Sequence, residues 1–230
     1  MSAQQQSTFV VVGGGLAASR AVEGIRSLDP SGSVTLVAEE QVLPYERPPL
    51  SKAVLKGDDP AESTFTHDES WYAANHVHTH LGNPATSLDA AARTVTLRDG
   101  TVLGYEKLLL ATGSSARALP VPGAELDGVL YLRELSESTA LAARLGDGHR
   151  IVVVGAGWIG LEVAAAAAEA GCRVTVVEPQ AAPLLGVMGP RVGGWFADLH
   201  RAHGVELLLG EGVEHGVAHP HGNAESAAST

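Results

Sequence analysis

Runs of apolar residues that end at glycines divide the first forty positions of the chain into short segments. The apolar run at 9–12 stops at Gly13, which is typical of a strand that is buried on both faces. Apolar residues then recur at helical spacing over 16–28, and a second apolar run follows at 34–37 after a turn. Strand, glycine turn, helix and strand predict a βαβ unit with a right-handed crossover.

The same pattern returns in the second half of the chain. An apolar run at 151–154 leads into a glycine-rich turn, an alanine-rich helix is expected next, and the apolar run at 174–177 ends at Glu178. Two βαβ units of one type indicate two nucleotide-binding sites, or one site and a degenerate copy of it. The sequence therefore predicts an α/β fold with two Rossmann-like dinucleotide-binding units.

The stretch between the two units has a different pattern. Three prolines within 43–52 exclude a continuous helix there. Asp99-Gly100 lies between the apolar-rich runs 94–97 and 101–103, which is a signal for a tight hairpin. The apolar run at 108–110 predicts another buried strand.

Further elements are expected around and after the second unit. A short helix is expected over 136–145, ahead of that unit. Trp195 and Phe196 share one side of a later helix, and a third strand is expected over 205–209. Residues 211–230 contain mostly Gly, Ala, His and Ser without periodicity, so we expect an unstructured tail.

Composition and charge exclude several classes of protein. The chain has 230 residues, with 15 Lys and Arg against 26 Asp and Glu, and the net charge of −11 argues against a nucleic-acid partner. The single cysteine, Cys172, excludes a disulfide scaffold, a Cys-ligated zinc site and a dithiol redox pair within this chain. The start lacks a signal sequence, and the longest apolar stretch contains three glycines and Glu162. We therefore expect a cytoplasmic protein without a membrane partner.

The second glycine turn has the spacing of a dinucleotide fingerprint. Gly155 would make the tight turn, Gly157 would let a pyrophosphate approach the backbone, and Gly160 would let the helix pack close to the strand. Glu178 is placed to hydrogen-bond a ribose diol, and its charge would repel a 2′-phosphate. No Arg directly follows it, so NADH is favoured over NADPH.

The first turn has a related fingerprint. Gly13 and Gly15 are followed by Ala18 in place of the third glycine, a replacement that the motif tolerates. Glu39 is the matching acidic residue. These features indicate an adenine dinucleotide, but they do not separate FAD from NAD.

Two further segments carry a family resemblance. The two fingerprints are joined through Pro-Tyr-Glu-Arg-Pro-Pro-Leu-Ser-Lys at 44–52 and Ala-Thr-Gly at 111–113. Over about residues 9–210 the chain resembles the FAD-dependent pyridine nucleotide-disulfide oxidoreductases, and within them the ferredoxin reductases that supply oxygenases. The resemblance implies an NADH-dependent flavoprotein reductase, an oxidoreductase that passes electrons from NADH through FAD to a ferredoxin.

The resemblance also assigns roles to individual positions. Those implied to contact FAD lie along the pyrophosphate, the ribose, the isoalloxazine and the adenine side: Gly13, Gly15, Ala17, Glu39, Arg47, Pro48, Lys52, Ala85, Thr112, Gly113 and Arg133. Those implied to contact NADH are Gly155, Gly157, Ile159, Gly160 and Glu178. Lys52 would lie near flavin N5 and pair with Glu162, which reaches the nicotinamide end, as the two catalytic residues. A cation there would stabilise the negative charge of the reduced flavin, whereas without the resemblance Lys52 could be an ordinary surface lysine.

The family builds its FAD-binding domain from two separated stretches, with the NADH-binding domain inserted between them. The resemblance therefore divides this chain into the N-terminal part of an FAD-binding domain (1–115), a connecting segment (116–148), an incomplete NADH-binding domain (149–210) and the tail (211–230). No later strand ending in Gly-Asp follows. On this interpretation the chain is a C-terminally truncated reductase.

Two alternatives remain open at this point. One is a nucleotide-binding fragment that does not turn over, and the other is an NADH reductase for another acceptor such as rubredoxin, oxygen or a quinone. The sequence holds no dithiol and no iron–sulfur ligands, so the electron acceptor is expected to be a separate protein. Arg47, Lys52 and Lys56 could form a basic docking patch for it.

Histidines give a weak metal signal. His76, His78 and His80 alternate and would share one face of a strand, but no nearby carboxylate or cysteine completes a metal site. A solvated strand face is the better interpretation. The histidines of the tail, His215, His219 and His221, carry less weight still.

Overall fold

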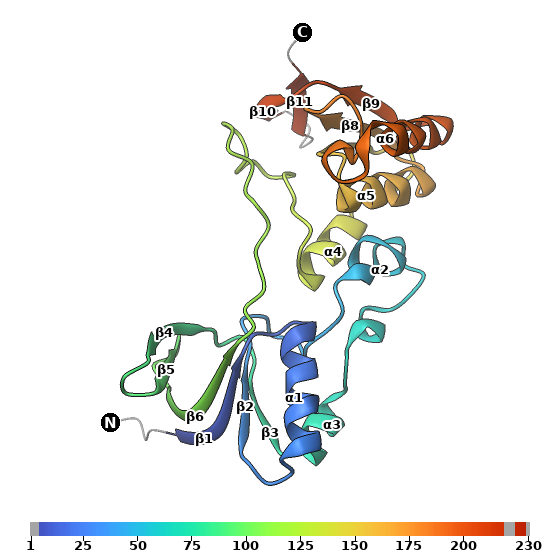
Figure 1. The fold of residues 1–230 in the computed structure, drawn as a ribbon. Coiled ribbons are helices and arrows are strands. Elements are labelled where there is room, and N and C mark those ends of the chain that lie inside the picture. The colour runs from blue at the N-terminus through green and yellow to red at the C-terminus, as the bar shows by residue number, and fades with distance from the viewer. Residues whose placement is uncertain (1–4, 219–223, 229–230) are drawn as a thin grey trace. The chain divides into compact units, whose positions relative to one another are not determined.

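The computed structural model describes residues 5–218 and 224–228, which form two compact units (Figure 1). Unit 1 comprises the residues up to Arg47 together with Ala61–Ser114, and unit 2 comprises Pro48–Pro60 and the residues from Ser115 onward. Each unit contains one of the two expected βαβ motifs.

A mixed sheet forms the centre of unit 1. Among the described residues it has six strands in the order β3-β2-β1-β6-β5-β4, in which β3, β2, β1 and β6 are parallel and β5 and β4 follow as antiparallel neighbours. The elements of unit 1 are β1 (Gln5–Val12), α1 (Leu16–Leu28), β2 (Val34–Val37), η2 (Ala61–Thr64), α3 (Glu69–Ala74), β3 (Val77–His80), β4 (Ala85–Asp89), β5 (Thr94–Leu97) and β6 (Val102–Leu110).

Both faces of β1 are buried, as its uninterrupted apolar run predicts. Val11 packs in one cluster with Val22 of α1, while Val10 and Val12 pack in a second cluster on the other face. Because successive side chains of a strand point to opposite faces, only a run without polar residues can fill both clusters.

The hairpin expected around Asp99-Gly100 is present as the β5–β6 pair. The two short strands expected at 101–103 and 108–110 differ from the structure, because they belong to the single strand β6. The first half of β6 pairs antiparallel with β5, whereas its second half pairs only with β1 among the described strands. One strand thus serves two different neighbours, which local patterning does not reveal.

Unit 2 has a smaller parallel sheet, of three described strands in the order β7-β8-β9. Its elements are η1 (Pro48–Ser51), α2 (Ala53–Lys56), α4 (Leu135–Ala142), β7 (Arg150–Val154), α5 (Trp158–Glu169), β8 (Arg173–Glu178), α6 (Leu185–Ala202), β9 (Glu206–Leu209), β10 (Val213–Ala218) and β11 (Ala224–Ala228). Three alanines of α5, Ala164, Ala166 and Ala167, are buried in the core of unit 2, where small side chains allow close packing of helix and strand.

Residues 48–60 pack with unit 2, although the family resemblance assigned them to the first domain. Leu55 of α2 is buried in the same cluster as Leu161 and Val163 of α5. The hydroxyl of Ser138 in α4 also donates to Leu50 O over 2.7 Å. Residues 48–60 are therefore part of the unit that carries the second glycine turn.

The helix expected around Trp195 is α6, which runs from Leu185 to Ala202. Gly189 has a φ of 76° and breaks the helical conformation ahead of Pro190, so α6 consists of two helical segments joined at a kink. Gly204, with a φ of 82°, follows the helix end.

The expectation of an unstructured tail over 211–230 is wrong for much of that segment. Strands β10 and β11 pair antiparallel, and the Gly216 amide donates to Pro122 O over 2.8 Å. Main-chain pairing of this kind does not require the large apolar side chains that sequence patterning detects. His215 lies in β10, while His219 and His221 lie outside the described residues.

Within 5–218 and 224–228, no helix combines the length and the apolar character needed to cross a membrane.

Candidate functional site

The carboxyl ends of three parallel strands meet at one edge of the unit 1 sheet, at the point where the chain switches from β1–β2 to β6. There the Gly13 amide donates to Val37 O over 2.8 Å and the Ala111 amide donates to Val12 O over 2.7 Å. Gly13 has a φ of 144°, and a Cβ added to it would lie 2.1 Å from Ala111 O. Only glycine fits that approach, and such a switch point is where ligands bind in open α/β sheets.

The predicted adenine-side residues reach the same edge of unit 1. Thr112 and Gly113 directly follow Ala111, and Thr112 N lies 3.4 Å from the added Cβ of Gly13. Ala85 begins β4, two residues after Asn83, whose amide donates to the carbonyl of Ala38, one residue past the end of β2. The structure therefore brings these separated parts of the sequence to one edge.

Gly15 provides the open space that a phosphate needs. It is the N-cap residue of α1, and the described residues supply no side-chain cap to this helix end. A Cβ added to Gly15 would have no described atom within 4 Å. Ala17 is the second residue of the helix. The first amides of α1, which have no acceptor within the helix, and the positive end of the helix dipole thus face open space, which suits a pyrophosphate.

Arg47 is held by two residues that the sequence analysis missed. Its guanidinium donates to Tyr45 Oη at 3.1 Å and to Glu40 Oε1 at 2.9 Å, and Tyr45 Oη donates to Glu40 Oε2 at 2.5 Å. Tyr45 is buried, and its main chain forms a β-bridge with Gly15. Arg47 is therefore fixed close to the glycine turn. The tyrosine two residues before Arg47 was the sequence feature that could have indicated this contact.

The glycine turn of unit 2 repeats this arrangement. Gly155 has a φ of 100°, and Gly157 is the N-cap of α5, with no described atom within 4 Å of an added Cβ. A Cβ on Gly160 would lie 2.0 Å from Gly155 O, so the helix packs directly against the turn. Ile159 is exposed at the second helical position. The three glycines thus have the backbone conformation and the space that a dinucleotide fingerprint needs.

Glu178 braces this turn. It ends β8, is 7% exposed, and accepts the Ala156 amide on Oε2 at 2.7 Å and the Gln180 amide on Oε1 at 2.9 Å. A carboxylate oxygen has a second lone pair, so ribose hydroxyls can still be bound. The sequence analysis assigned only the ribose role and missed the contact with the turn.

The acidic residue of unit 1 is held differently. In both turns the amide of the first glycine donates to the last valine of the second strand at 2.8 Å, which makes Ala38 equivalent to Glu178. Glu39 lies one residue further along. Its side chain is 73% exposed and faces Arg98 at 3.8 Å.

Lys52 and Glu162 form an ion pair within unit 2. Lys52 Nζ lies 2.8 Å from Glu162 Oε2, and Ser51 Oγ donates to the same oxygen at 2.5 Å. Lys52 Nζ also donates to Pro48 O at 3.3 Å. The amide of Arg133, in the same unit, donates to a carboxylate of α4. The structure brings together the two residues expected to be catalytic, although they are far apart in the sequence.

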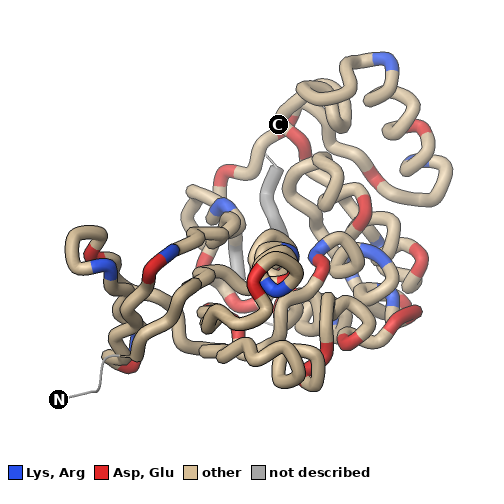
Figure 2. Tube along the Cα trace, turned by 60° about the horizontal axis from the view of Figure 1, so that its bottom comes forward, with Lys and Arg blue, Asp and Glu red and all other residues tan. Residues whose placement is uncertain are grey.

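The cations expected to form a docking patch are each opposite carboxylates. Lys56 lies 3.0 Å from Glu169 and 3.2 Å from Asp58, and the Glu169 carboxylate, followed by Asp58, raises the Lys56 pKa above its usual value. Lys52 pairs with Glu162, as described above. Figure 2 shows acidic and basic residues interspersed along the chain. These contacts weaken the case for a basic docking patch.

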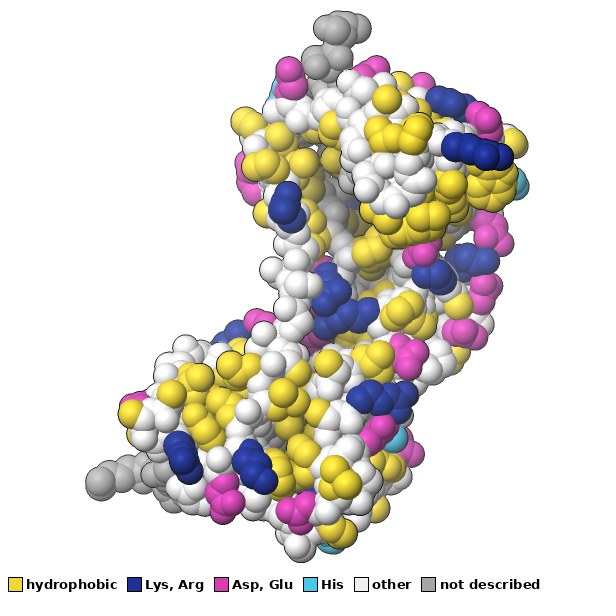
Figure 3. Space-filling model, viewed as in Figure 1, with side chains coloured by type: hydrophobic (Ala, Val, Ile, Leu, Met, Phe, Trp, Pro, Cys, Tyr) yellow, Lys and Arg dark blue, Asp and Glu magenta, His cyan; other side chains and the backbone are white. Residues whose placement is uncertain are grey.

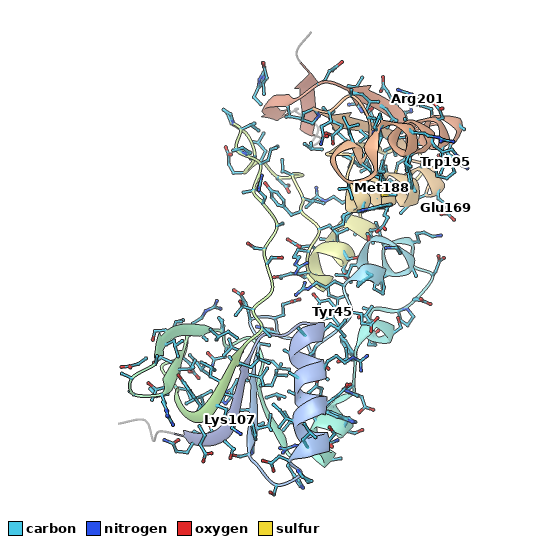
Figure 4. All side chains as sticks on the ribbon, viewed as in Figure 1. Tyr45, Lys107, Glu169, Met188, Trp195 and Arg201 are labelled. Atoms are coloured by element: carbon cyan, nitrogen blue, oxygen red, sulfur yellow. The ribbon has the colours of Figure 1, made fainter. Side chains whose placement is uncertain are left out.

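Apolar side chains are exposed next to the second glycine turn. They come from the start of α5 and from α6 and include Trp158, Met188 and Trp195, the last of which is 59% exposed. Phe196 packs edge-on between Trp158 and Trp195, with centroid distances of 5.6 and 5.0 Å. Figure 3 shows apolar side chains gathered on this part of unit 2, and Figure 4 labels Met188 and Trp195 there.

The alternating histidines have no metal-like surroundings. His78 and His80 lie in β3, while His76 precedes the strand with a φ of 50°. In the part of the chain that the structure describes, no group of three or more His, Cys, Asp or Glu is placed to hold a metal ion.

Comparison with known proteins places these features in context. A family model described as "Pyridine nucleotide-disulphide oxidoreductase" matches residues 7–228. Rhodocoxin reductase of Rhodococcus erythropolis is 41% identical over 207 residues, which cover 90% of this chain and 48% of that protein. The ferredoxin–NAD(+) reductase component of the anthranilate 1,2-dioxygenase system of Burkholderia cepacia is 42% identical over 204 residues, covering 87% and 50%.

A solved structure extends the comparison to three dimensions. The reductase in the crystal structure of the covalent putidaredoxin reductase–putidaredoxin complex matches with a TM-score of 0.92 and 34% identity, over 97% of this chain and 55% of that one. The chain thus spans about half the length of the curated relatives that it matches.

Proposed function

Because the chain belongs to the pyridine nucleotide-disulphide oxidoreductase family, we propose that it acts in an NADH-dependent flavoprotein reductase that passes electrons through FAD to a ferredoxin. The observation that carries the proposal is the presence of two dinucleotide-type glycine turns, each with open space before an uncapped helix end among the described residues. Two such turns in one chain suit a donor nucleotide and a second dinucleotide that receives its electrons.

Unit 1 is the proposed site for FAD. The open space at Gly15 would admit the pyrophosphate, Arg47 would supply a fixed cation beside the isoalloxazine, and Glu39 would bind a ribose. Thr112 and Gly113 would lie along the adenine side. FAD, when bound, accepts two electrons as a hydride and releases them singly, which suits an iron–sulfur acceptor.

Unit 2 is the proposed site for NADH. Gly157 leaves space for the pyrophosphate, and the Glu178 carboxylate lies against the turn in a nearly buried position. A fixed negative charge binds ribose hydroxyls and repels a 2′-phosphate. We therefore propose that this unit selects NADH over NADPH.

Lys52 and Glu162 are the proposed catalytic pair. The ammonium of Lys52 would stabilise the negative charge that accumulates when electrons arrive, as preorganised cations do in other enzymes. Glu162 keeps that ammonium in a defined position through their 2.8 Å contact.

The proposed acceptor is a ferredoxin, because relatives described above are reductases of ferredoxin-dependent systems. The sequence has one cysteine, so it offers no dithiol to receive the electrons within this chain. Rubredoxin is the second acceptor to be compared in the experiment below.

A visible spectrum of the purified chain incubated with FAD, followed by anaerobic NADH, tests the proposal. We expect retained flavin bands near ~450 nm that bleach with NADH and recover when oxidised ferredoxin is added. Lys52→Met should slow the bleaching about 100-fold, whereas Lys107→Met, an exposed lysine over the Phe9 ring, should leave it unchanged. A chain that binds NADH but no FAD would instead be a nucleotide-binding fragment, and recovery with rubredoxin alone would change the acceptor.

A further inference from the structure

Two consecutive residues place their donors on one carboxylate oxygen. Ser51 Oγ donates to Glu162 Oε2 at 2.5 Å, and Lys52 Nζ lies 2.8 Å from the same atom. A hydroxyl that donates to an ionised carboxylate forms a bond of about 2.5–2.7 Å, because the charge strengthens it. Glu162 therefore has two partners of different kinds, a neutral hydroxyl and an ammonium.

The two partners differ in how firmly they are held. Ser51 is 5% exposed and ends the turn η1, which Ser138 ties down through its buried hydrogen bond to Leu50 O. The Lys52 side chain is 52% exposed and ends a flexible four-carbon stem. Since exposed ion pairs are weak and mobile links, the buried hydroxyl is the stronger constraint on the carboxylate.

The main chain beneath Glu162 is also fixed. Its neighbours Leu161 and Val163 are both buried in the core of unit 2, so α5 cannot shift to move the carboxylate. Only the rotamers of the Glu162 side chain remain variable, and a long side chain has several of them. A hydrogen bond from a rigid donor selects one.

We propose that Ser51 is a positioning residue that keeps the Glu162 carboxylate in place whether or not Lys52 is bound to it. The inference rests on the function proposed above, in which Lys52 and Glu162 act where the hydride is transferred. Its consequence is that Lys52 can leave and rejoin the ion pair while the carboxylate stays in position. Ser51 thereby allows the Lys52 ammonium to move away while the Glu162 carboxylate keeps its position for the ammonium's return.

NMR of the chain without added cofactor tests the positioning role directly. With ¹³C-labelled glutamate side chains, and Glu162→Gln to assign the signal, the Glu162 order parameter is measured in each variant. We expect Lys52→Met to leave it unchanged, because Ser51 still holds the carboxylate. Ser51→Ala should lower it below about 0.6, the range of flexible groups, and Ser51→Thr should restore it.

Ser138→Ala is the matched control. It removes another buried hydroxyl, one on α4 that donates to a carbonyl of the same turn and not to Glu162. We expect it to lower the free energy of unfolding, and to lower the Glu162 order parameter much less than Ser51→Ala does, because Ser51 Oγ still donates to the carboxylate. An unchanged order parameter in Ser51→Ala overturns the proposal. If that variant does not fold, a loss of order in Lys52→Met overturns it equally.

Flavin reduction distinguishes this inference from the proposed function itself. In chain loaded with FAD, Ser51→Ala should slow reduction by NADH about tenfold with an unchanged Kd for NADH, since misplaced groups cost rate more than binding. An unchanged reduction rate overturns the inference. A chain that binds no FAD but shows the expected Glu162 behaviour contradicts the proposed function and supports the positioning role.

Discussion

Three alanine substitutions in unit 1 separate folding from cofactor binding. Gly13, Gly15 and Gly24 follow one another along the turn and α1, and each would meet different surroundings as alanine. At Gly13 the added Cβ would lie 2.1 Å from a main-chain oxygen, at a φ of 144°. At Gly15 and Gly24 no described atom lies within 4 Å of it, and the φ of Gly15, −101°, suits any residue.

The expected effects on stability follow from these surroundings. Backbone strain of the kind at Gly13 costs about 1–3 kcal/mol, and the collision adds to it, so Gly13→Ala should lose more than about 3 kcal/mol. That is a large part of the roughly 5–15 kcal/mol by which domains are stable. Gly15→Ala should change stability by less than about 1 kcal/mol, since glycine is only moderately better than alanine as an N-cap. Gly24→Ala, in a helix interior, should stabilise by about 0.5–1 kcal/mol.

The expected effects on binding are ordered differently. The methyl group of Gly15→Ala would enter the space in front of the first helical amides, and we expect FAD affinity to fall at least about tenfold, or 1.4 kcal/mol. Gly24 lies nine residues further along α1, about 13 Å away at 1.5 Å per residue, and its substitution should leave FAD affinity unchanged. Urea unfolding measures the stability of each variant, and titration of flavin fluorescence measures its affinity for FAD.

Two results would refute this reasoning. A Gly15→Ala variant that binds FAD as tightly as the unaltered chain would show that the turn does not receive the pyrophosphate. An equal loss of affinity in Gly15→Ala and Gly24→Ala would show a general disturbance of the helix instead. Separately, a fully stable Gly13→Ala variant would contradict the close approach of the two strand ends.

Three further substitutions test other parts of the chain. Glu178→Ala leaves two backbone amides without their acceptors, so unfolding should lose about 1–3 kcal/mol and binding titrations should show a weaker preference for NADH over NADPH. Burial lowers the pKa of His200 below its usual 6.5, so stability present above that pH is lost as the pH falls, and His200→Gln should flatten the decline seen in thermal unfolding between about pH 7 and 5. Glu169 raises the pKa of Lys56, so their pair stabilises below the usual pKa of 10.5 and is lost at higher pH. Lys56→Met should make thermal unfolding less sensitive to alkaline pH.

The elements that could be predicted from the sequence are those whose burial follows from the local spacing of apolar residues. β1 is buried on both faces, so a run of valines predicts it, and the turn after it needs a glycine for a reason visible in the structure. β10 and β11 were not predicted, because their pairing depends on main-chain hydrogen bonds. The continuity of β6 was missed because its two halves have different neighbours.

The candidate site was predictable to a different extent. Lys52 and Glu162 were paired by resemblance alone, because no spacing rule links residues on η1 and α5. The hydroxyl of Ser51 was missed for the same physical reason, because its contact with Glu162 is made by the packing of segments that are far apart in the sequence. The contacts of Glu40 and Tyr45 with Arg47 are local, but a polar side chain in a proline-rich segment gives no sign of which neighbour it will bind.

The two glycine turns also differ in how much of their geometry is already in place before a dinucleotide binds. Glu178 is nearly buried and accepts two backbone amides, so its carboxylate is already fixed at the turn. At the equivalent position unit 1 has Ala38, and Glu39, one residue further, is mostly exposed with a single distant cation. Ordering a free side chain costs entropy at the moment of binding, whereas a fixed one has already lost it in folding. On the proposed function, selection at the ribose would therefore be built into unit 2, whereas in unit 1 the tight main-chain approach at Gly13 and the fixed Arg47 would provide more of the preorganised geometry than the acidic residue does.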